Sequence, residues 1–355
     1  MFARTTTVTL AALAISTTAG LAQVVAPQYV NNYAIFNLGP VPGVPGSYGG
    51  VAMSNTDPDL MLIGGNANAS TGGVYSIRVR RNQCGNITGF IGTAQLVSTA
   101  PQIDGGLFVT TDNVILTTRY NDNGINMIKP GSTAPDKVVS LTPLGVASST
   151  GSLTIVPQGL PGAGRLKIAS YNASTFYDAT ISPDGLGTYN VSNVTLTANI
   201  QGGPEGIAYV PSGSPLFPNP ALLIAEYGGG LISAWDINAN GDPVPGTRRS
   251  FITGLSGAEG AFLDITSGDF LFSTFGGGGR VIVVQGFAER VTCDSIDFNQ
   301  NTVFPEDQDV IDFFRVLAGD ECPTCADIDF NNNCVFPEDQ DVIDFFNVLA
   351  GGTCP

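Results

Sequence analysis

Hydrophobic and polar residues alternate in short runs along most of this chain, and the runs recur at regular intervals. Five of them open with a glycine, followed by apolar residues at alternate positions, a turn and a second β-rich run. These glycines are Gly50, Gly106, Gly151, Gly206 and Gly260, so successive openings lie 45 to 56 residues apart. Because alternation with a period of two is typical of strands with one buried face, the pattern predicts a repeated unit of short strands.

A repeat of roughly 40 to 50 residues built from short strands is typical of a propeller blade. We therefore expect a mainly β fold, a β-propeller over residues 23–290. It has five blades by this pattern, or six if a degenerate repeat lies in one of the longer intervals; a pair of β-sandwiches is the alternative. The strand-like run Tyr29–Leu38 has no repeat of its own, and the fifth repeat ends near Phe287. The N-terminal strand is thus predicted to complete the last blade.

An acidic residue stands just before three of the five openings: Glu205 and Glu259 directly precede the glycine, and Asp104 stands two residues before Gly106. If these acids begin the innermost strands, their carboxylates converge on the central channel, where they would favour a bound cation or raise one pKa. The other two openings follow Gly49 and Thr150, so the ring of acids is incomplete. The alternative interpretation is turn chemistry, in which the acid satisfies a backbone amide next to glycine.

The phrases GPEGIAY and GAEGAF, at the fourth and fifth openings, are similar to phrases in exported propellers of the broad gluconolactonase and senescence-marker class. This resemblance covers about 265 residues, 23–290. It implies a propeller fold and, for the three channel acids, a metal-dependent hydrolase or lactonase site.

The end of the chain holds one 30-residue segment written twice, Cys293–Cys322 and Cys325–Cys354, with seven differences between the copies. Each copy places oxygen-bearing side chains at alternate positions and continues into an apolar pattern at i, i+3, i+4 and i+7, which predicts a loop followed by a short amphipathic helix. The apolar positions are Val310, Phe313, Phe314 and Leu317, and in the second copy Val342, Phe345, Phe346 and Leu349. The two helices are predicted to pack together through them.

Oxygen ligands at alternate positions, with one backbone carbonyl, are the means by which a flexible loop binds calcium. The predicted ligands occupy equivalent positions of the two copies. In the first copy they are Asp297, Asn299, Asn301, the carbonyl of Val303, and Asp307 or Asp309, with Glu306 a further candidate for the last position. In the second copy they are Asp329, Asn331, Asn333, the carbonyl of Val335, and Asp339 or Asp341. An alternative register of the second copy begins at Asp327 and ends at Glu338.

These loop and helix residues resemble the dockerin module, a pair of EF-hand-like repeats, and especially its cysteine-flanked variety. Two features depart from that pattern. Thr302 and Cys334 stand where glycine is usual, and the segment from Asp297 to Asp309 is one residue longer than a 12-residue loop. The resemblance implies that residues 291–355 dock onto a cohesin-like or cell-surface protein partner.

Cysteines bracket both copies at the same separation, which predicts the disulfides Cys293–Cys322 and Cys325–Cys354 in an oxidising compartment. Each bond would close one loop and helix. Cys84 and Cys334 are left over, and they either pair with each other across the two parts of the chain or stay free.

The first 22 residues combine Arg4, a short apolar stretch and small residues up to Ala22, as in a secretory signal peptide. We therefore expect an exported protein, extracellular or at the cell surface, without a membrane span. The net charge is −16, with 14 acids and one base from Cys293 onward; without a basic patch, nucleic-acid binding is not expected. The sequence contains no histidine, which excludes Ser-His-Asp catalysis and imidazole metal ligands.

Taken together, these features predict a secreted, calcium-stabilised binding or display protein that is anchored through its tail, with an unknown propeller ligand. The sequence favours a binding protein over an enzyme. The alternative is a metal-dependent hydrolase or lactonase that uses the acidic site in the channel.

Overall fold

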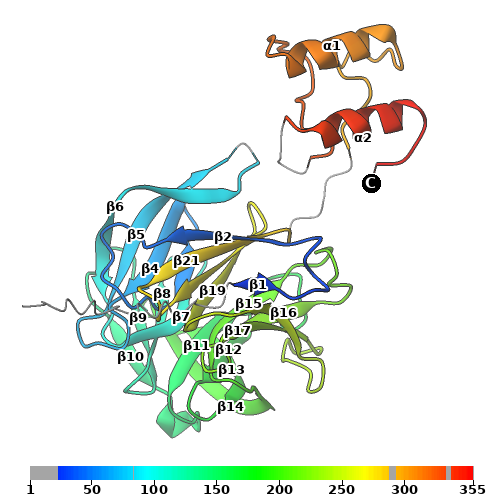
Figure 1. The fold of residues 1–355 in the computed structure, drawn as a ribbon. Coiled ribbons are helices and arrows are strands. Elements are labelled where there is room, and N and C mark those ends of the chain that lie inside the picture. The colour runs from blue at the N-terminus through cyan, green and yellow to red at the C-terminus, as the bar shows by residue number, and fades with distance from the viewer. Residues whose placement is uncertain (1–22, 83, 288–292, 333–336, 355) are drawn as a thin grey trace, which may run out of the picture.

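The structure, a computed structural model, describes residues 23–82, 84–287, 293–332 and 337–354. In this part of the chain five antiparallel sheets are followed by two helices (Figure 1). The predicted signal peptide, the start of the predicted tail, and Asn333, Cys334 and Val335 lie outside the described residues. Both helices in the described ranges are too short and too polar to cross a membrane.

Each sheet is one blade of a five-bladed β-propeller, which confirms the predicted fold class and blade number. The first blade is β3 (Val51–Met53), β4 (Leu60–Gly65), β5 (Gly73–Arg81) and β6 (Ile87–Thr99). The second is β7 (Ile103–Val109), β8 (Ile115–Arg119), β9 (Gly124–Ile128) and β10 (Lys137–Ser140), followed by a 3₁₀ turn, Thr142–Leu144. The third is β11 (Thr150–Ile155), β12 (Leu166–Ser170), β13 (Thr175–Pro183) and β14 (Tyr189–Asn199).

The last two blades each recruit a strand from the N-terminal end of the described chain. The fourth is β15 (Pro204–Val210), β16 (Ala221–Glu226), β17 (Leu231–Asp236) and β18 (Arg249–Thr253), with β1 (Val24–Val25) paired to β18. The fifth is β19 (Ala258–Asp264), β20 (Asp269–Thr274), β21 (Arg280–Gln285) and β2 (Ala34–Gly39). The N-terminal strand therefore completes the last blade, as the sequence predicts, and ties the two ends of the propeller together.

An aromatic cluster holds this N-terminal segment against the fourth and fifth blades. The Tyr29 ring stacks on Phe217, with centroids 5.5 Å apart, and Tyr33 lies 4.7 Å from Phe287. Phe251 meets both tyrosine rings edge on. All five side chains are buried, so the closure of the ring is stabilised by apolar burial as well as by strand pairing.

The five glycines that open the repeats bring the inner strands into close contact around the axis. A Cβ atom on Gly206 would lie 2.2 Å from the carbonyl oxygen of Glu259, and one on Gly260 would lie 2.5 Å from the Cα of Gly50. Comparable backbone clashes would occur at the other three, Gly50, Gly106 and Gly151. Each repeat therefore opens with glycine because no side chain fits where neighbouring inner strands touch.

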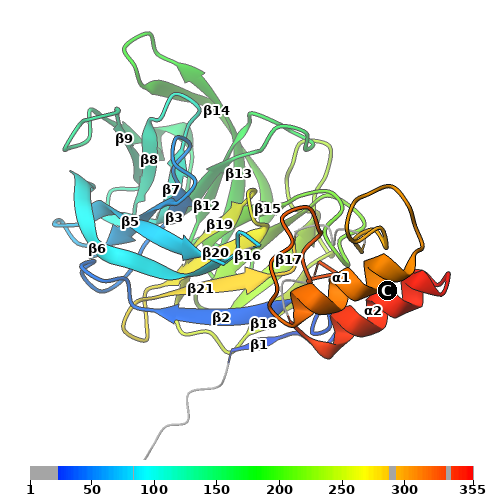
Figure 2. The same ribbon diagram turned by 90° about the horizontal axis from the view of Figure 1, so that it is seen from above.

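The tail consists of α1 (Asp307–Leu317) and α2 (Asp339–Leu349), which lie side by side in both views (Figures 1 and 2). Phe313 and Phe345 stack at 4.3 Å and are fully buried, so the predicted apolar faces do pack together. Phe314 and Phe346 also touch, at 5.9 Å, but they remain 43% and 40% exposed. They lie at the margin of the helix pair rather than in its core.

The disulfide pairing predicted for the tail is wrong. Cys293 bonds to Cys354 and Cys322 bonds to Cys325. Because the two copies pack against each other, the first cysteine of one comes beside the last cysteine of the other, with Cα atoms 5.6 Å apart. The two inner cysteines face each other across a tight turn. Cys84, whose state the sequence left open, is disulfide-bonded.

Candidate cation site in the propeller channel

Three carboxylates meet at one end of the central channel. Asp104, Glu205 and Glu259 are each the second residue of the innermost strand of a blade, β7, β15 and β19. One oxygen of each lies within 4.8 Å of one oxygen of the other two, and all three side chains are at most 3% exposed. Among the described residues, no other acids or cysteines form such a group. Ring closure thus brings together three residues that are far apart in the sequence.

The carboxylates carry an electrostatic cost that the protein relieves only in part. Both oxygens of Asp104, Oε2 of Glu205 and Oε1 of Glu259 lack a donor at good hydrogen-bond geometry, and the Asn68 side chain and the Gly105 amide offset only part of the cost. Burial raises the pKa of Asp104 to about 7. It also raises the pKa of Glu205 and of Glu259 well above their usual range, and repulsion between the acids adds to the effect. A cation at this point would offset both the burial and the repulsion.

Glu205 and Glu259 line a cavity of about 140 Å³, and Asp104 lies against these two acids. Asn68 lines the same cavity, and its side-chain oxygen is also buried without a hydrogen-bond donor. Three carboxylates and one amide oxygen are the kind of ligand set that Ca²⁺ prefers, because hard cations are bound by oxygen. The residues present therefore fit a calcium ion better than a softer metal.

Aromatic rings form the wall of this cavity. Each belongs to a different blade and follows directly after the second strand of that blade: Tyr120, Tyr171, Tyr227 and Phe275. Neighbouring rings are 6.3, 5.8 and 6.1 Å apart, at interplanar angles of 60°, 89° and 71°. The rings form a continuous arc above the carboxylates, a shape that can hold a small ligand against the floor of the cavity.

Sequence reasoning missed Asn68 and the aromatic arc, although a repeated aromatic residue in the sequence indicates the arc. Four of the five repeats end their second strand with an aromatic residue, in the phrases TTRY, IASY, IAEY and STF. A residue at the same place in successive blades lies at the same level of the channel. The recurrence of an aromatic residue at the end of this phrase could therefore have indicated the arc.

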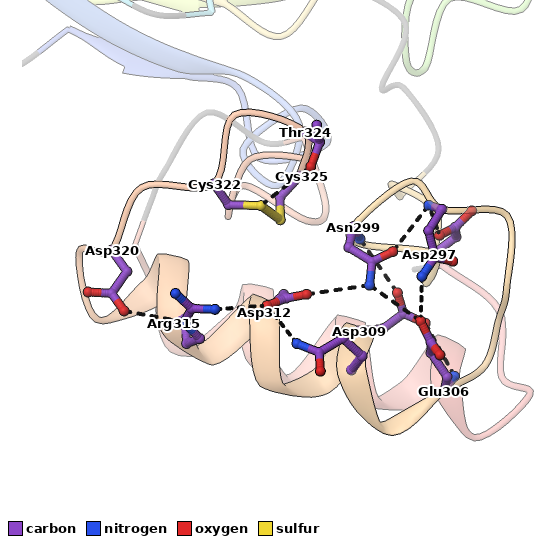
Figure 3. Close-up of a disulfide and its surroundings, with 12 residues drawn as sticks. Asp297, Asn299, Glu306, Asp309, Asp312, Arg315, Asp320, Cys322, Thr324 and Cys325 are labelled. Carbon is purple, nitrogen blue, oxygen red and sulfur yellow. Dashed lines mark hydrogen bonds and ion pairs between the residues drawn. A yellow bond between two sulfur atoms is a disulfide. The ribbon is translucent and has the colours of Figure 1, made fainter.

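The structure also places the predicted ligands of the first tail loop (Figure 3). Asp297 accepts hydrogen bonds from the backbone amides of Asn301 and Thr302, at 3.0 and 2.9 Å. Asp309 is fully buried and reaches back to the loop, where it accepts from the amides of Glu306, at 3.2 Å, and Asn299. The loop is therefore closed on itself by contacts to its first and last acids.

The remaining positions of that loop divide between inward and outward side chains. Glu306 accepts from the side-chain amide of Asn301 at 2.6 Å, so both face the loop interior. Asp307 is exposed on the first turn of α1, and Val303 is 57% exposed. Thr302 adopts a positive φ of 69°, the conformation for which glycine is usual at this position.

The described part of the second loop has contacts equivalent to those of the first loop. Asp329 and Asp341 are buried, and Glu338 donates its backbone amide to Asp341 at 3.2 Å, as in the first copy. Asn331 donates to Asp344 at 2.9 Å, and Asp339 is exposed like Asp307. Calcium binding by either loop stays a prediction.

The fold and the channel define the class of this protein as a five-bladed β-propeller with a buried acidic site on its axis. No known protein family matches the sequence, and no curated protein matches it. Among solved structures, it is similar to the PQQ domain of pyranose dehydrogenase from Coprinopsis cinerea, at 9% identity and a TM-score of 0.43 over 74% of this chain and 97% of that one. An auxiliary nutrient binding protein from Bacteroides thetaiotaomicron has 8% identity and a TM-score of 0.41, over 71% and 76%.

A third similar structure is the PQQ-bound form of aldose sugar dehydrogenase from Streptomyces coelicolor, at 15% identity and a TM-score of 0.38 over 70% and 83%. At these identities the likeness concerns the general fold. The function of the channel is therefore inferred from its own residues and not from these three proteins.

Proposed function

We propose that this is an exported, calcium-dependent binding protein whose ligand site is the acidic mouth of the propeller channel. The observation that carries the proposal is the set of three buried carboxylates with oxygens within 4.8 Å of one another. Four of their oxygens lack a well-placed hydrogen-bond donor, so the protein compensates their burial only in part. A divalent cation supplies the rest of that compensation, and its remaining coordination positions are open to a ligand.

The aromatic arc gives this site a place for the ligand. Hydrogen-bonded or metal-bound oxygens would anchor one side of a small molecule, while Tyr171 and Tyr227 would contact its apolar faces. The alternative function, a metal-dependent hydrolase or lactonase, would use the same cation to polarise a carbonyl group. The two functions are distinguished by whether a bound ester or lactone is hydrolysed or only bound.

Terbium luminescence tests the cation site in the full-length protein. Tb³⁺ replaces Ca²⁺ at oxygen sites and emits strongly when a nearby tyrosine is excited. Tyr120, Tyr171 and Tyr227 line the channel cavity, whereas the tail from Cys293 onward contains neither tyrosine nor tryptophan. Sensitised emission therefore reports the channel and not the tail loops. We expect emission that saturates with Tb³⁺ and that Ca²⁺ competes away.

The controls use one substitution in each part of the chain. Glu205→Gln keeps the size of the side chain but removes its charge, and we expect it to abolish the sensitised emission. Asp297→Asn, in the first tail loop, should leave the emission unchanged. No saturable emission in the wild type, or equal emission from Glu205→Gln, would exclude the channel site.

We further propose that the tail docks this propeller to a protein partner through one face of its helix pair. Four apolar side chains at equivalent positions of α1 and α2 remain between 40% and 57% exposed: Ile311, Phe314, Ile343 and Phe346. Contact between Phe314 and Phe346 joins them into one apolar patch across both helices. Calcium in the two loops would fix the helices that carry this patch.

Capture on the cell surface tests the docking proposal. Labelled full-length protein should bind to cell envelopes of its source in the presence of Ca²⁺ and be released by a chelator. Phe314→Ser combined with Phe346→Ser should abolish that capture, while Leu186→Ser, at an equally apolar but 76% exposed position of the propeller, should not. Equal capture of both variants would contradict docking through the helices.

A further inference from the structure

A second cavity lies at the other end of the same channel. It measures about 280 Å³ and is lined by the later residues of the inner strands together with the loops that follow them. Leu107, Ile155, Ile207 and Phe262 contribute from four different blades. We call this cavity the apolar chamber. It is separate from the acidic cavity, and the proposed calcium site does not use it.

The ring of glycines separates the two cavities. On β15 the order along the strand is Glu205, Gly206 and Ile207, so the acid faces one cavity and the isoleucine lines the other. On β19 Glu259 and Ala261 flank Gly260 in the same way. The inner strands touch one another at these glycines, between the two cavities.

The lining of the apolar chamber carries no charged side chain. Leucine, isoleucine, phenylalanine, alanine and proline dominate it, and the polar side chains are Thr154, Gln158, Tyr209 and Ser212. The Tyr209 hydroxyl already donates to the carbonyl oxygen of Gly241, which leaves few polar groups for a ligand. Such a cavity offers no charged partner to an anion or a cation.

The rim of the apolar chamber includes an isoleucine that the fold itself does not require. Ile265 is 88% exposed, in the turn between β19 and β20. Asp264 accepts hydrogen bonds in this turn from the amide of Thr266 and the hydroxyl of Ser267, so the turn is stabilised by its polar residues. The isoleucine extends the apolar lining outward to the opening of the chamber.

We infer that the apolar chamber is a binding site for a small, uncharged, apolar molecule. A closed cavity of about 150 Å³ lined by aliphatic and aromatic side chains holds one benzene ring. The larger volume here suits a body of two fused rings or a short acyl chain. The cavity volume is near that of a small-molecule site, which favours such a molecule over a helix or loop of a partner protein.

Fluorescence of a neutral probe, N-phenyl-1-naphthylamine, tests this site in the full-length protein. Its emission rises when it leaves water for an apolar cavity. We expect saturable binding of one probe per chain. Ile265→Asp places a charge at the rim and should weaken binding about tenfold, since a charged group at an apolar site costs affinity on the order of 1.4 kcal/mol or more. Ala261→Phe fills the chamber and should abolish binding.

The matched control is Leu186→Asp, which exchanges an exposed leucine for the same acid outside the chamber and should bind the probe like the wild type. Circular dichroism checks that Ala261→Phe folds; if it does not, Ile265→Asp decides. Glu205→Gln should leave probe binding unchanged, so the result is independent of the cation site. No saturable binding, or equal binding by Ile265→Asp and Leu186→Asp, overturns the inference. A wild-type dimer that Ile265→Asp dissociates would instead make a second copy the occupant.

Discussion

The channel site and the first tail loop are both rich in carboxylate and amide oxygens, but they satisfy those oxygens in opposite ways. In the channel, Asp104 comes from one blade and two glutamates come from others, and the protein supplies few donors to them. In the tail, Asp297 and Asp309 belong to one contiguous segment and accept backbone amides from that segment.

This difference predicts different consequences of removing a cation. The acids of the tail loop accept hydrogen bonds from the loop itself. A cation there would therefore bind to a loop that is already ordered. The channel acids have few such partners, so protons or a cation would offset most of the cost of their burial. The stability of the propeller should therefore depend on pH. The stability of the tail should depend on its disulfides and on the capping contacts of its helices.

The largest effect is expected from pH on the calcium-free propeller. The pKa of Asp104 rises on folding from 3.8 to about 7, so the folded state binds this proton more tightly than the unfolded chain. The contribution of this carboxyl to the free energy of unfolding should therefore be fully present below about pH 4 and fall as the pH rises to 7, by roughly 4 kcal/mol at about 1.4 kcal/mol per pKa unit. Urea unfolding followed by the fluorescence of Trp235, buried in the fourth blade, measures it.

Two controls sharpen this measurement. Saturating Ca²⁺ should restore stability at pH 7 and above, because the cation replaces the lost protons. Asp104→Asn should remove the share of the slope that belongs to that carboxyl group. A calcium-free propeller whose stability is level from pH 4 to pH 7 would show that the three acids are compensated by groups other than a cation.

The disulfide between Cys293 and Cys354 should produce the next largest effect, and on the tail alone. It spans 61 residues, so its loss is expected to destabilise the helix pair by about 4 kcal/mol in the chain-entropy model. Loss of the bond between Cys322 and Cys325, which spans 3 residues, should cost about 2 kcal/mol. Helix content at 222 nm follows the tail, and Trp235 fluorescence should stay unchanged in both serine variants.

The sequence predicted local features better than features that depend on ring closure. The strands, the opening glycines and the two helices follow from alternation, turn residues and helical spacing within a few residues. The order of the tail cysteines does not reveal whether the copies bond within or across, because that depends on how α1 and α2 pack. Only the folded ring shows that Asn68 joins the channel acids.

A smaller effect is expected when the buried acid of the first tail loop is removed. Asp309→Ala deletes the carboxylate that accepts the backbone amide of Glu306 at the start of α1, which should cost about 1 to 2 kcal/mol without calcium. The matched change Asp307→Ala, at an exposed position of the same helical turn, should cost less than about 0.5 kcal/mol. Thermal unfolding at 222 nm compares them. Equal costs would place the last acid of the loop at Asp307 instead.

The smallest effect concerns the position where the tail loop departs from the usual glycine. Thr302 has a φ of 69°, which costs a β-branched residue on the order of 1 to 2 kcal/mol, whereas glycine adopts it freely. Glycine also gains freedom in the unfolded chain, so Thr302→Gly should stabilise the tail by less than about 1 kcal/mol. Thr324→Gly, at a threonine without positive φ, should destabilise it slightly. If both glycine variants destabilise the tail, the loop conformation at Thr302 is not strained. The tail loop would then differ even more from the channel, whose buried acids have few hydrogen-bond donors.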